Sequence, residues 1–126
     1  MSAVLKDEPR LARMLERDLA EVMAIESAIY SHPWTSGNFG DSLRAGYACR
    51  VWRRDGELTG YFIVMAAAGE AHLLNLSIAP GYQRSGHGSA LLGEAAAAAV
   101  KLGAHHLFLE VRPRDRKSTR LNSSHQ

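Results

Sequence analysis

The chain has 126 residues, enough for one compact domain around one hydrophobic core and too few for two domains. Hydrophobic residues make up 46% of the sequence and charged residues 22%, which is typical of a folded globular protein and excludes a disordered one. The net charge of +2 is too small to indicate a nucleic-acid-binding protein, but it is compatible with a small phosphate-bearing ligand.

Signals for export, membrane insertion and metal binding are missing from this sequence. The N-terminal residues lack the apolar stretch of about 7–15 residues of a secretory signal, and no run approaches the roughly 20 apolar residues of a membrane span. The single cysteine, Cys49, cannot form an internal disulfide, and the six histidines have no metal-ligand spacing. We therefore expect a cytoplasmic protein without a metal and without a membrane partner.

Two helices are predicted in the first third of the chain. From Asp18 to Ile29 apolar residues recur at helical spacing, and Asp18 is placed to cap the first turn. Pro33 ends this pattern, because proline cannot donate a backbone hydrogen bond. Thr35 then caps a second, short helix that runs to about Leu43.

Three strands follow the two helices. Residues 47–53 and 58–67 are separated by Asp55-Gly56, a dipeptide favoured in hairpin turns, so these two strands should pair antiparallel. A third apolar run, residues 71–79, ends at Pro80.

An Ala-rich helix and a last strand complete the predicted elements. Residues 86–102 have the strongest helix-forming composition of the chain, and Gly103 is placed to end the helix. Residues 106–111 form an apolar strand. A strand, a helix and a strand in this order make a βαβ unit with parallel strands, so the predicted fold class is mixed α/β.

The loop of residues 83–89 has the features of an anion-binding site. It leads into a helix N-terminus, where unpaired N–H groups and the positive end of the helix dipole meet a ligand. Gly86 and Gly88 lack Cβ atoms and let phosphate oxygens approach the backbone, and Arg84 adds a positive charge. The spacing fits neither the P-loop nor the Rossmann glycine motif, and a purely structural turn is the alternative.

The residues around this loop resemble a known family. Residues 75–92, which read NLSIAPGYQRSGHGSALL, are similar to the acetyl-CoA motif of the GNAT superfamily, with its Q/R-x-x-G-x-G/A core. His32-Pro33-Trp34-Thr35 with Phe39, and Leu109-Glu110-Val111-Arg112-Pro113, resemble the ribosomal-protein alanine N-acetyltransferase branch. The resemblance covers roughly residues 11–115 and implies the GNAT fold, a central mixed sheet with flanking helices.

The resemblance also implies which residues hold acetyl-CoA. The backbone of Leu76, Ser77 and Ile78 would pair with the pantetheine arm, and the Ile78 N–H would polarise the thioester carbonyl. The pyrophosphate would lie against the main-chain amides of the loop residues Gln83, Arg84, Ser85, Gly86, His87, Gly88 and Ser89.

Glu110 matches the general base of the family, and a surface carboxylate at a strand end is the alternative. An N-terminal α-amine, with a pKa of about 7.7–8.0, is roughly a tenth neutral at pH 7, whereas a lysine is under about a thousandth neutral, so one carboxylate suits the α-amine better. Tyr30, His32 and Trp34 would border the acceptor, although core packing explains Trp34 equally well. For His72, an exposed or satisfied histidine is simpler than a role in the cleft.

The resemblance therefore implies an acetyl-CoA-dependent N-acetyltransferase that acts on the N-terminal alanine of a small-subunit ribosomal protein. Two alternatives stay open. One is a GNAT enzyme that acts on another peptide or a small amine. The other is a truncated chain that binds acetyl-CoA without turnover, or binds nothing. The sequence does not indicate an oligomeric state.

The C-terminal residues depart from the family pattern. The family implies an Asn, a helix with a Tyr that acts as the acid, and two closing strands after the base, but Asp115 stands in place of the Asn and residues 116–126 are polar without periodicity. We therefore expect a GNAT domain over residues 1–115 that lacks the C-terminal helix and last strands. Residues 116–126 would be a disordered tail from a frameshift, cloning or assembly, and an uninterrupted genomic reading frame through Gln126 would contradict this.

Overall fold

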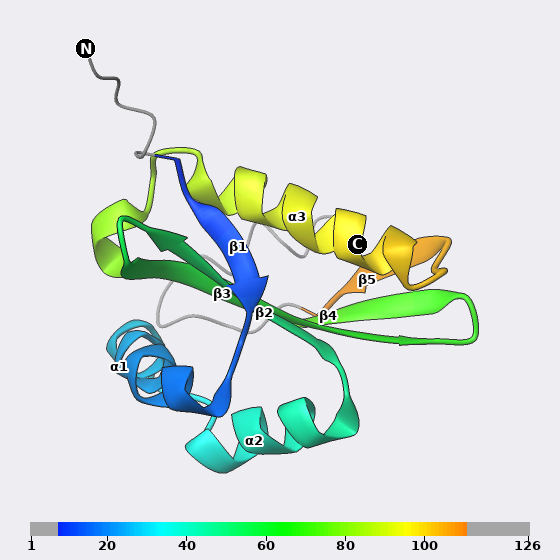
Figure 1. The fold of residues 1–126 in the computed structure, drawn as a ribbon, viewed down its shortest axis with the longest axis horizontal. Helices are drawn as coiled ribbons and strands as arrows, with labels where there is room; N and C mark the ends of the chain where they lie inside the picture. Colours follow the sequence, from blue (N-terminus) through cyan, green and yellow to red (C-terminus); the bar gives the residue numbers. More distant parts are fainter. Residues whose placement is uncertain (1–7, 111–126) are drawn as a thin grey trace.

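Five strands form one mixed sheet with helices on both of its faces in the computed structural model, which describes residues 8–110 (Figure 1). The strands are β1 (Arg10–Arg13), β2 (Ala48–Arg54), β3 (Glu57–Ala67), β4 (Glu70–Ile78) and β5 (His106–Leu109). The helices are α1 (Leu19–Ile29), α2 (Ser36–Ala45) and α3 (His87–Lys101), with 3-10 turns η2 (Glu16–Asp18) and η3 (Pro80–Tyr82).

The order of the strands in the sheet follows the chain. β1, β2, β3 and β4 pair antiparallel with their neighbours, and β5 pairs parallel with β4, as expected for the βαβ unit around α3. The predicted mixed α/β class is thus confirmed. The expected end of the last strand at Val111 and the expected tail of residues 116–126 lie outside the described residues.

The hairpin between β2 and β3 forms as predicted. Asp55 and Gly56 have φ angles of 53° and 83°, the two positive values that a type I′ turn requires. A second hairpin between β3 and β4 turns at Ala68 and Gly69, with φ angles of 52° and 81°. This second turn was not predicted, because alanine is uncommon at a positive φ.

Strand β1 was not predicted either. It has only four residues, pairs with β2 at the edge of the sheet and is largely exposed. A strand this short shows no alternation in the sequence, so its position depends on the partner strand rather than on its own pattern.

Thr35 caps α2 as expected, since its Oγ1 accepts the Asn38 N–H at 3.0 Å. The prediction for Asp18 is wrong, because its backbone is already helical and its side chain makes no capping bond to α1. Instead, Asp18 Oδ2 accepts the Leu15 N–H at 2.7 Å, and Oδ1 accepts a hydrogen bond from Arg53 at 2.9 Å. The carboxylate therefore fixes the turn before α1 and ties it to β2.

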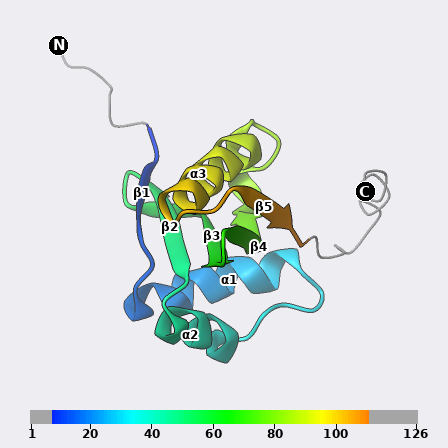
Figure 2. The same cartoon turned by 90° about the vertical axis from the view of Figure 1, so that its right-hand side faces the viewer.

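The helices lie on opposite faces of the sheet (Figure 2), and each face has its own apolar core. α3 covers one face, where Phe62 and Val64 of β3 meet Leu91. α1 and α2 cover the other face, where Tyr61 and Ile63 point. β3 supplies both cores because successive side chains of a strand alternate between faces.

A β-bulge at Leu74 changes this alternation in β4. The register passes from Leu73 opposite Val64 to Asn75 opposite Ile63, so Leu74 has no partner in β3. Leu73 packs on the α3 face, whereas Leu74 and Asn75 both meet groups on the α1 face. The bulge thereby turns the C-terminal half of β4 relative to its N-terminal half.

β5 pairs only with the N-terminal half of β4. Leu109 lies opposite Leu73, and the Glu110 N–H donates to the Leu73 carbonyl at 3.3 Å. No strand among residues 8–110 pairs with this edge of β4 from Asn75 to Ile78. The end of β4 therefore combines a paired edge toward β3 with an open edge on its other side.

Candidate functional site

The open edge of β4 directs backbone groups away from the sheet. Residues of an antiparallel ladder point their N–H and C=O alternately to one edge and the other. The Ala79 N–H donates to the Thr59 carbonyl at 2.8 Å, so the neighbouring Ile78, and Leu76 two residues earlier, point to the open edge. Gln83 reaches the Ile78 carbonyl from there, at 3.0 Å. Ser77 points its backbone N–H and C=O to β3, so only its side chain is available to the cavity.

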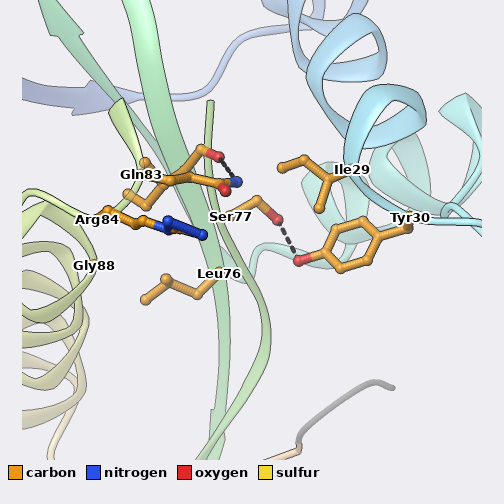
Figure 3. A pocket seen from close by; sticks show the side chains of 8 residues that line it. Ile29, Tyr30, Leu76, Ser77, Gln83, Arg84 and Gly88 are labelled. Carbon is orange, nitrogen blue, oxygen red and sulfur yellow. Dashed lines mark hydrogen bonds between the residues drawn. The ribbon is translucent and has the colours of Figure 1, made fainter. Parts of the chain in front are cut away.

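A cavity of about 400 Å³ lies beside this edge (Figure 3). The end of α1 forms one wall, β4 forms the floor, and the loop of residues 83–89 with the start of α3 forms the opposite wall. All the lining residues except Ile29 were predicted as site residues from the sequence. The lining residues are Ile29, Tyr30, Leu76, Ser77, Ile78, Gln83, Arg84 and Gly88.

The loop reaches α3 through two left-handed residues. Arg84 has a φ of 64° and Gly86, the residue before α3, has a φ of 86°. The left-handed conformation is costly for a side chain such as that of Arg84. The Arg84 side chain extends toward the interior of the cavity (Figure 3). The loop thus places a guanidinium and a helix N-terminus on the same wall.

Four of the predicted loop residues are not among the residues that line the cavity: Ser85, Gly86, His87 and Ser89. Ser85 donates to the Tyr82 carbonyl at 2.9 Å, and its Oγ lies 2.7 Å from His87 Nδ1. The His87 ring packs near Trp52 and Tyr82, with centroid distances of 5.8 and 5.5 Å. Ser85 and His87 therefore brace the loop, and a contact of these residues with a ligand through main-chain amides stays a prediction.

Gly60 of β3 allows α3 to approach the end of β4 closely. A Cβ atom there would lie 2.9 Å from the Ser77 carbonyl oxygen and 3.1 Å from Leu91 of α3. Both distances are shorter than ordinary van der Waals contacts. No sequence pattern singles out this glycine, because the contact joins segments that are distant in the chain.

A buried carboxylate lies behind the α1 wall. Glu26 is fully buried, and its Oε1 accepts the Tyr61 hydroxyl at 2.7 Å and the Asn75 amide Nδ2 at 3.2 Å. Its Oε2 accepts the Trp34 N–H at 2.9 Å. Burial, followed by the nearby Glu26 charge, raises the pKa of Tyr61 far above its ordinary value, so Tyr61 remains a donor.

Hydrogen bonds lead from this carboxylate to the cavity. The Ser77 hydroxyl donates to Asn75 Oδ1 at 2.8 Å, and Ser77 Oγ lies 3.0 Å from the Tyr30 hydroxyl (Figure 3). Glu26 and Asn75 were missed in the sequence analysis. A signal for Glu26 was present, because it lies four residues after Val22 and three before Ile29, on the apolar stripe of α1.

Glu110 lies beyond the end of β5 and is not among the cavity residues. Its Oε2 is 3.2 Å from His72 Nδ1, and the His72 ring stacks on Phe108 at a centroid distance of 5.3 Å. Leu107 packs toward α3, so Phe108 and Glu110 belong to the α1 face. Because Leu109 lies opposite Leu73, Glu110 is level with Leu74, and at a strand rise of about 3.3 Å per residue it stands roughly 7 Å before Leu76 along β4. His72 is thus a satisfied histidine, as the simpler interpretation had it.

The two other predicted acceptor residues lie outside the cavity. His32 is exposed, and its Nδ1 is 3.2 Å from Ser31 Oγ. The Trp34 ring packs on Phe39 with a centroid distance of 5.0 Å. Core packing therefore accounts for Trp34, while Tyr30 is the predicted acceptor residue that meets the cavity.

The one cysteine of the chain is buried away from this site. Burial raises the pKa of the Cys49 thiol to about 11, which makes it a poor nucleophile at neutral pH. Residues 8–110 contain no group of three or more His, Cys, Asp or Glu side chains arranged to hold a metal ion. No helix in the same range has the length and apolar character needed to cross a membrane.

Comparisons with known proteins show which family this architecture belongs to. Residues 19–122 match the model of the acetyltransferase (GNAT) family. The chain is 32% identical over 95 residues to the ribosomal protein bS18-alanine N-acetyltransferase of Escherichia coli K12, and the match covers 75% of the chain but 64% of the relative. The chain thus spans less than two thirds of the length of this relative.

Solved structures give the same result. The crystal structure of the ribosomal-protein-S18-alanine N-acetyltransferase from Escherichia coli matches with a TM-score of 0.77 at 28% identity, over 92% of this chain and 75% of that one. The PaiA N-acetyltransferase of Thermoplasma acidophilum, solved with coenzyme A, shares the fold with a TM-score of 0.73 at 19% identity, over 92% and 86%. The family match covers most of the sequence, so the chain belongs to the acetyltransferase (GNAT) family.

Proposed function

We propose that this protein transfers the acetyl group of acetyl-CoA to an N-terminal α-amine, that of an alanine of a ribosomal protein. The observation that carries the proposal is the open edge of β4 beside the loop of residues 83–89. A strand edge and a helix N-terminus on one cavity suit a ligand that has both an amide-containing arm and phosphates.

The residues present fit acetyl-CoA. The open-edge backbone groups of Leu76 and Ile78 can pair with the amides of pantetheine as a further strand would. Arg84 and the start of α3 supply positive charge for the pyrophosphate. A Cβ atom on Gly88 would meet no protein atom within 4 Å, which leaves space for phosphate oxygens at that point.

The proposed reaction is a direct transfer. The neutral amine nitrogen attacks the thioester carbonyl carbon, the C–S bond breaks, and an N–C bond forms. The Ile78 N–H, which points to the open edge, would donate to the carbonyl oxygen as its negative charge grows. Glu110 would take the proton of the amine through a bridging water, because it lies apart from the cavity. The departing thiolate, whose conjugate acid has a pKa near 8.5, takes a proton from solvent.

The acceptor is proposed from two arguments. The Escherichia coli relatives in sequence and in structure are alanine N-acetyltransferases of ribosomal protein bS18. An α-amine is also neutral at pH 7 in roughly a tenth of the molecules, against less than about a thousandth for lysine, and a single partly exposed carboxylate suits the first.

Two measurements on the full chain test the proposal. Calorimetric titration with acetyl-CoA measures binding of the co-substrate, and mass spectrometry measures acetylation of peptides with N-terminal Ala, Ser or Met, of polyamines and of aminoglycosides. We expect binding, and turnover that is fastest on the alanine peptide. Faster turnover of a small amine would assign the protein to another acceptor, and binding without turnover would identify a chain that only binds acetyl-CoA.

A further inference from the structure

We propose that Glu26 is a positioning residue, which acts through Asn75 and Ser77 to make the Tyr30 hydroxyl a hydrogen-bond acceptor for an N–H group of the substrate amine. The inference rests on the proposed function, since it concerns the acceptor side of the same cavity. None of the four side chains needs to move for this role, because they are already joined by contacts of 2.8–3.2 Å.

The direction of every bond in this chain of contacts follows from Glu26. A carboxylate can only accept hydrogen bonds, so Asn75 must turn its NH₂ group to Glu26 Oε1 and its carbonyl oxygen to Ser77. Ser77 has one hydroxyl hydrogen, and it is given to Asn75 Oδ1 at 2.8 Å. Toward Tyr30, Ser77 Oγ can therefore only accept.

The direction of the Tyr30 hydroxyl hydrogen follows in the same way. Its single hydrogen is donated to Ser77 Oγ, across 3.0 Å (Figure 3). Any further group that meets the Tyr30 oxygen must then be a donor. Both Tyr30 and Ser77 line the cavity. The buried carboxylate therefore makes the Tyr30 oxygen a hydrogen-bond acceptor on the cavity wall.

An amine N–H fits this acceptor better than other donors at the site. Tyr30 comes from the end of α1, on the wall opposite Arg84 and Gly88, which face the proposed phosphate position (Figure 3). The pantetheine arm also contains amide N–H groups, and they are the second source of the same chemistry. Binding measurements on the two substrates separate these sources.

The test compares two peptides that bind to the wild-type protein saturated with coenzyme A, which prevents turnover. One peptide has an N-terminal alanine, and the other has a pyruvoyl group, in which a ketone oxygen replaces the amine. The measured quantity is the ratio of their dissociation constants. We expect Tyr30→Phe and Glu26→Gln each to lower the preference for the alanine peptide about tenfold, the value of one hydrogen bond, with little change in the affinity for coenzyme A.

Glu26→Gln is informative because the amide keeps the shape of the carboxylate. An amide NH₂ that faces Asn75 would turn the Asn75 amide over, and Ser77 would then accept from Asn75 and donate to Tyr30. The Tyr30 hydrogen would point to the cavity and favour the ketone. A role limited to folding would lower both affinities together and leave the ratio unchanged.

Two further variants complete the test. Ser77→Ala removes the hydroxyl that receives the Tyr30 hydrogen, and it should lower the same ratio even where Glu26→Gln does not fold. Tyr47→Phe removes a hydroxyl outside the cavity and should leave the ratio unchanged. Unchanged ratios in Tyr30→Phe and Ser77→Ala, or a parallel loss of coenzyme A affinity, would overturn the inference. Failure of wild-type turnover with intact ratios would instead count against the proposed function alone.

Discussion

The two walls of the cavity are built in different ways. The loop wall, Gln83 to Gly88, depends on local backbone geometry: a left-handed Arg84, a left-handed Gly86 and the first turn of α3. The α1 wall depends on side chains from distant segments, since the contacts of Glu26 with Tyr61 and Asn75 span 35 and 49 residues. The loop wall is exposed, and the support of the α1 wall is buried.

The difference shows which part of a site tolerates change. A local loop keeps its shape when one contact is lost, because neighbouring peptide units set its angles. A buried network does not tolerate the loss of one contact in this way, because each donor left without an acceptor retains the full free-energy cost of its desolvation. We therefore expect changes on the α1 wall to affect stability and acceptor binding, and changes in the loop to affect cofactor binding.

The largest expected effect comes from Glu110→Gln, which leaves both walls intact and removes the proposed base. The amide cannot take a proton at neutral pH, so kcat should fall by about 10²–10⁴ while the acetyl-CoA dissociation constant stays close to that of the wild type. Steady-state kinetics with the alanine peptide and calorimetry measure the two quantities. A kcat within about twofold of the wild type would remove Glu110 from the mechanism.

Tyr61→Phe tests the buried support of the α1 wall. Tyr61 is fully buried and donates to Glu26 at 2.7 Å, so loss of its hydroxyl should lower the free energy of unfolding by about 1.5–3 kcal/mol, the range for a bond to a charged group. Urea denaturation measures this change. Tyr82→Phe is the control, because the Tyr82 hydroxyl donates to Glu57 at an exposed site, and its loss should leave the free energy of unfolding close to that of the wild type.

The same contrast explains what could be read from the sequence. The loop, the helix that follows it and the Asp55-Gly56 hairpin were predicted correctly, because turn and helix signals are local. Strand β1 and the bulge at Leu74 were missed, since they depend on the neighbouring strand for their position. Glu26 lies in a segment whose spacing predicts only an ordinary amphipathic helix, although a carboxylate on an apolar stripe is a signal that a buried partner exists.

Gly88→Ala tests the loop wall by separating stability from binding. Gly88 lies in α3, and a Cβ there would meet no protein atom within 4 Å, so alanine should stabilise the protein by about 0.5–1 kcal/mol. The methyl group would nevertheless enter the space proposed for phosphate oxygens, and we expect acetyl-CoA affinity to fall about tenfold. Thermal unfolding and calorimetric titration measure the two effects.

Gly93→Ala is the matched control for Gly88→Ala. Gly93 belongs to the same helix, and its added Cβ would also meet nothing within 4 Å, but it does not line the cavity. It should raise stability by a similar amount, about 0.5–1 kcal/mol, and leave acetyl-CoA affinity unchanged. Equal affinities of the two alanine variants would show that phosphates do not approach the helix at Gly88.

The smallest expected effect concerns an ion pair that lies outside both walls. It shows how much an exposed contact contributes to the free energy of unfolding. Arg53 binds Glu21 at 2.7 Å, and this hydrogen bond holds the pKa of the Glu21 carboxyl below its ordinary value. A lowered pKa in the folded state stabilises the protein above the unfolded-state value of about 4.3, and this contribution is lost as the pH falls through the folded-state value.

Glu21→Gln should therefore lower the free energy of unfolding by only about 0.2–1 kcal/mol at neutral pH, because the Glu21 side chain is half exposed. The difference from the wild type should shrink below about pH 4 and in about 1 M salt, where the charge is lost or screened. Urea denaturation across this range measures it. A difference that persisted at low pH would mean that Glu21 acts through packing. The Arg53–Glu21 pair could then not serve as the exposed ion pair with which the buried Glu26 network is compared.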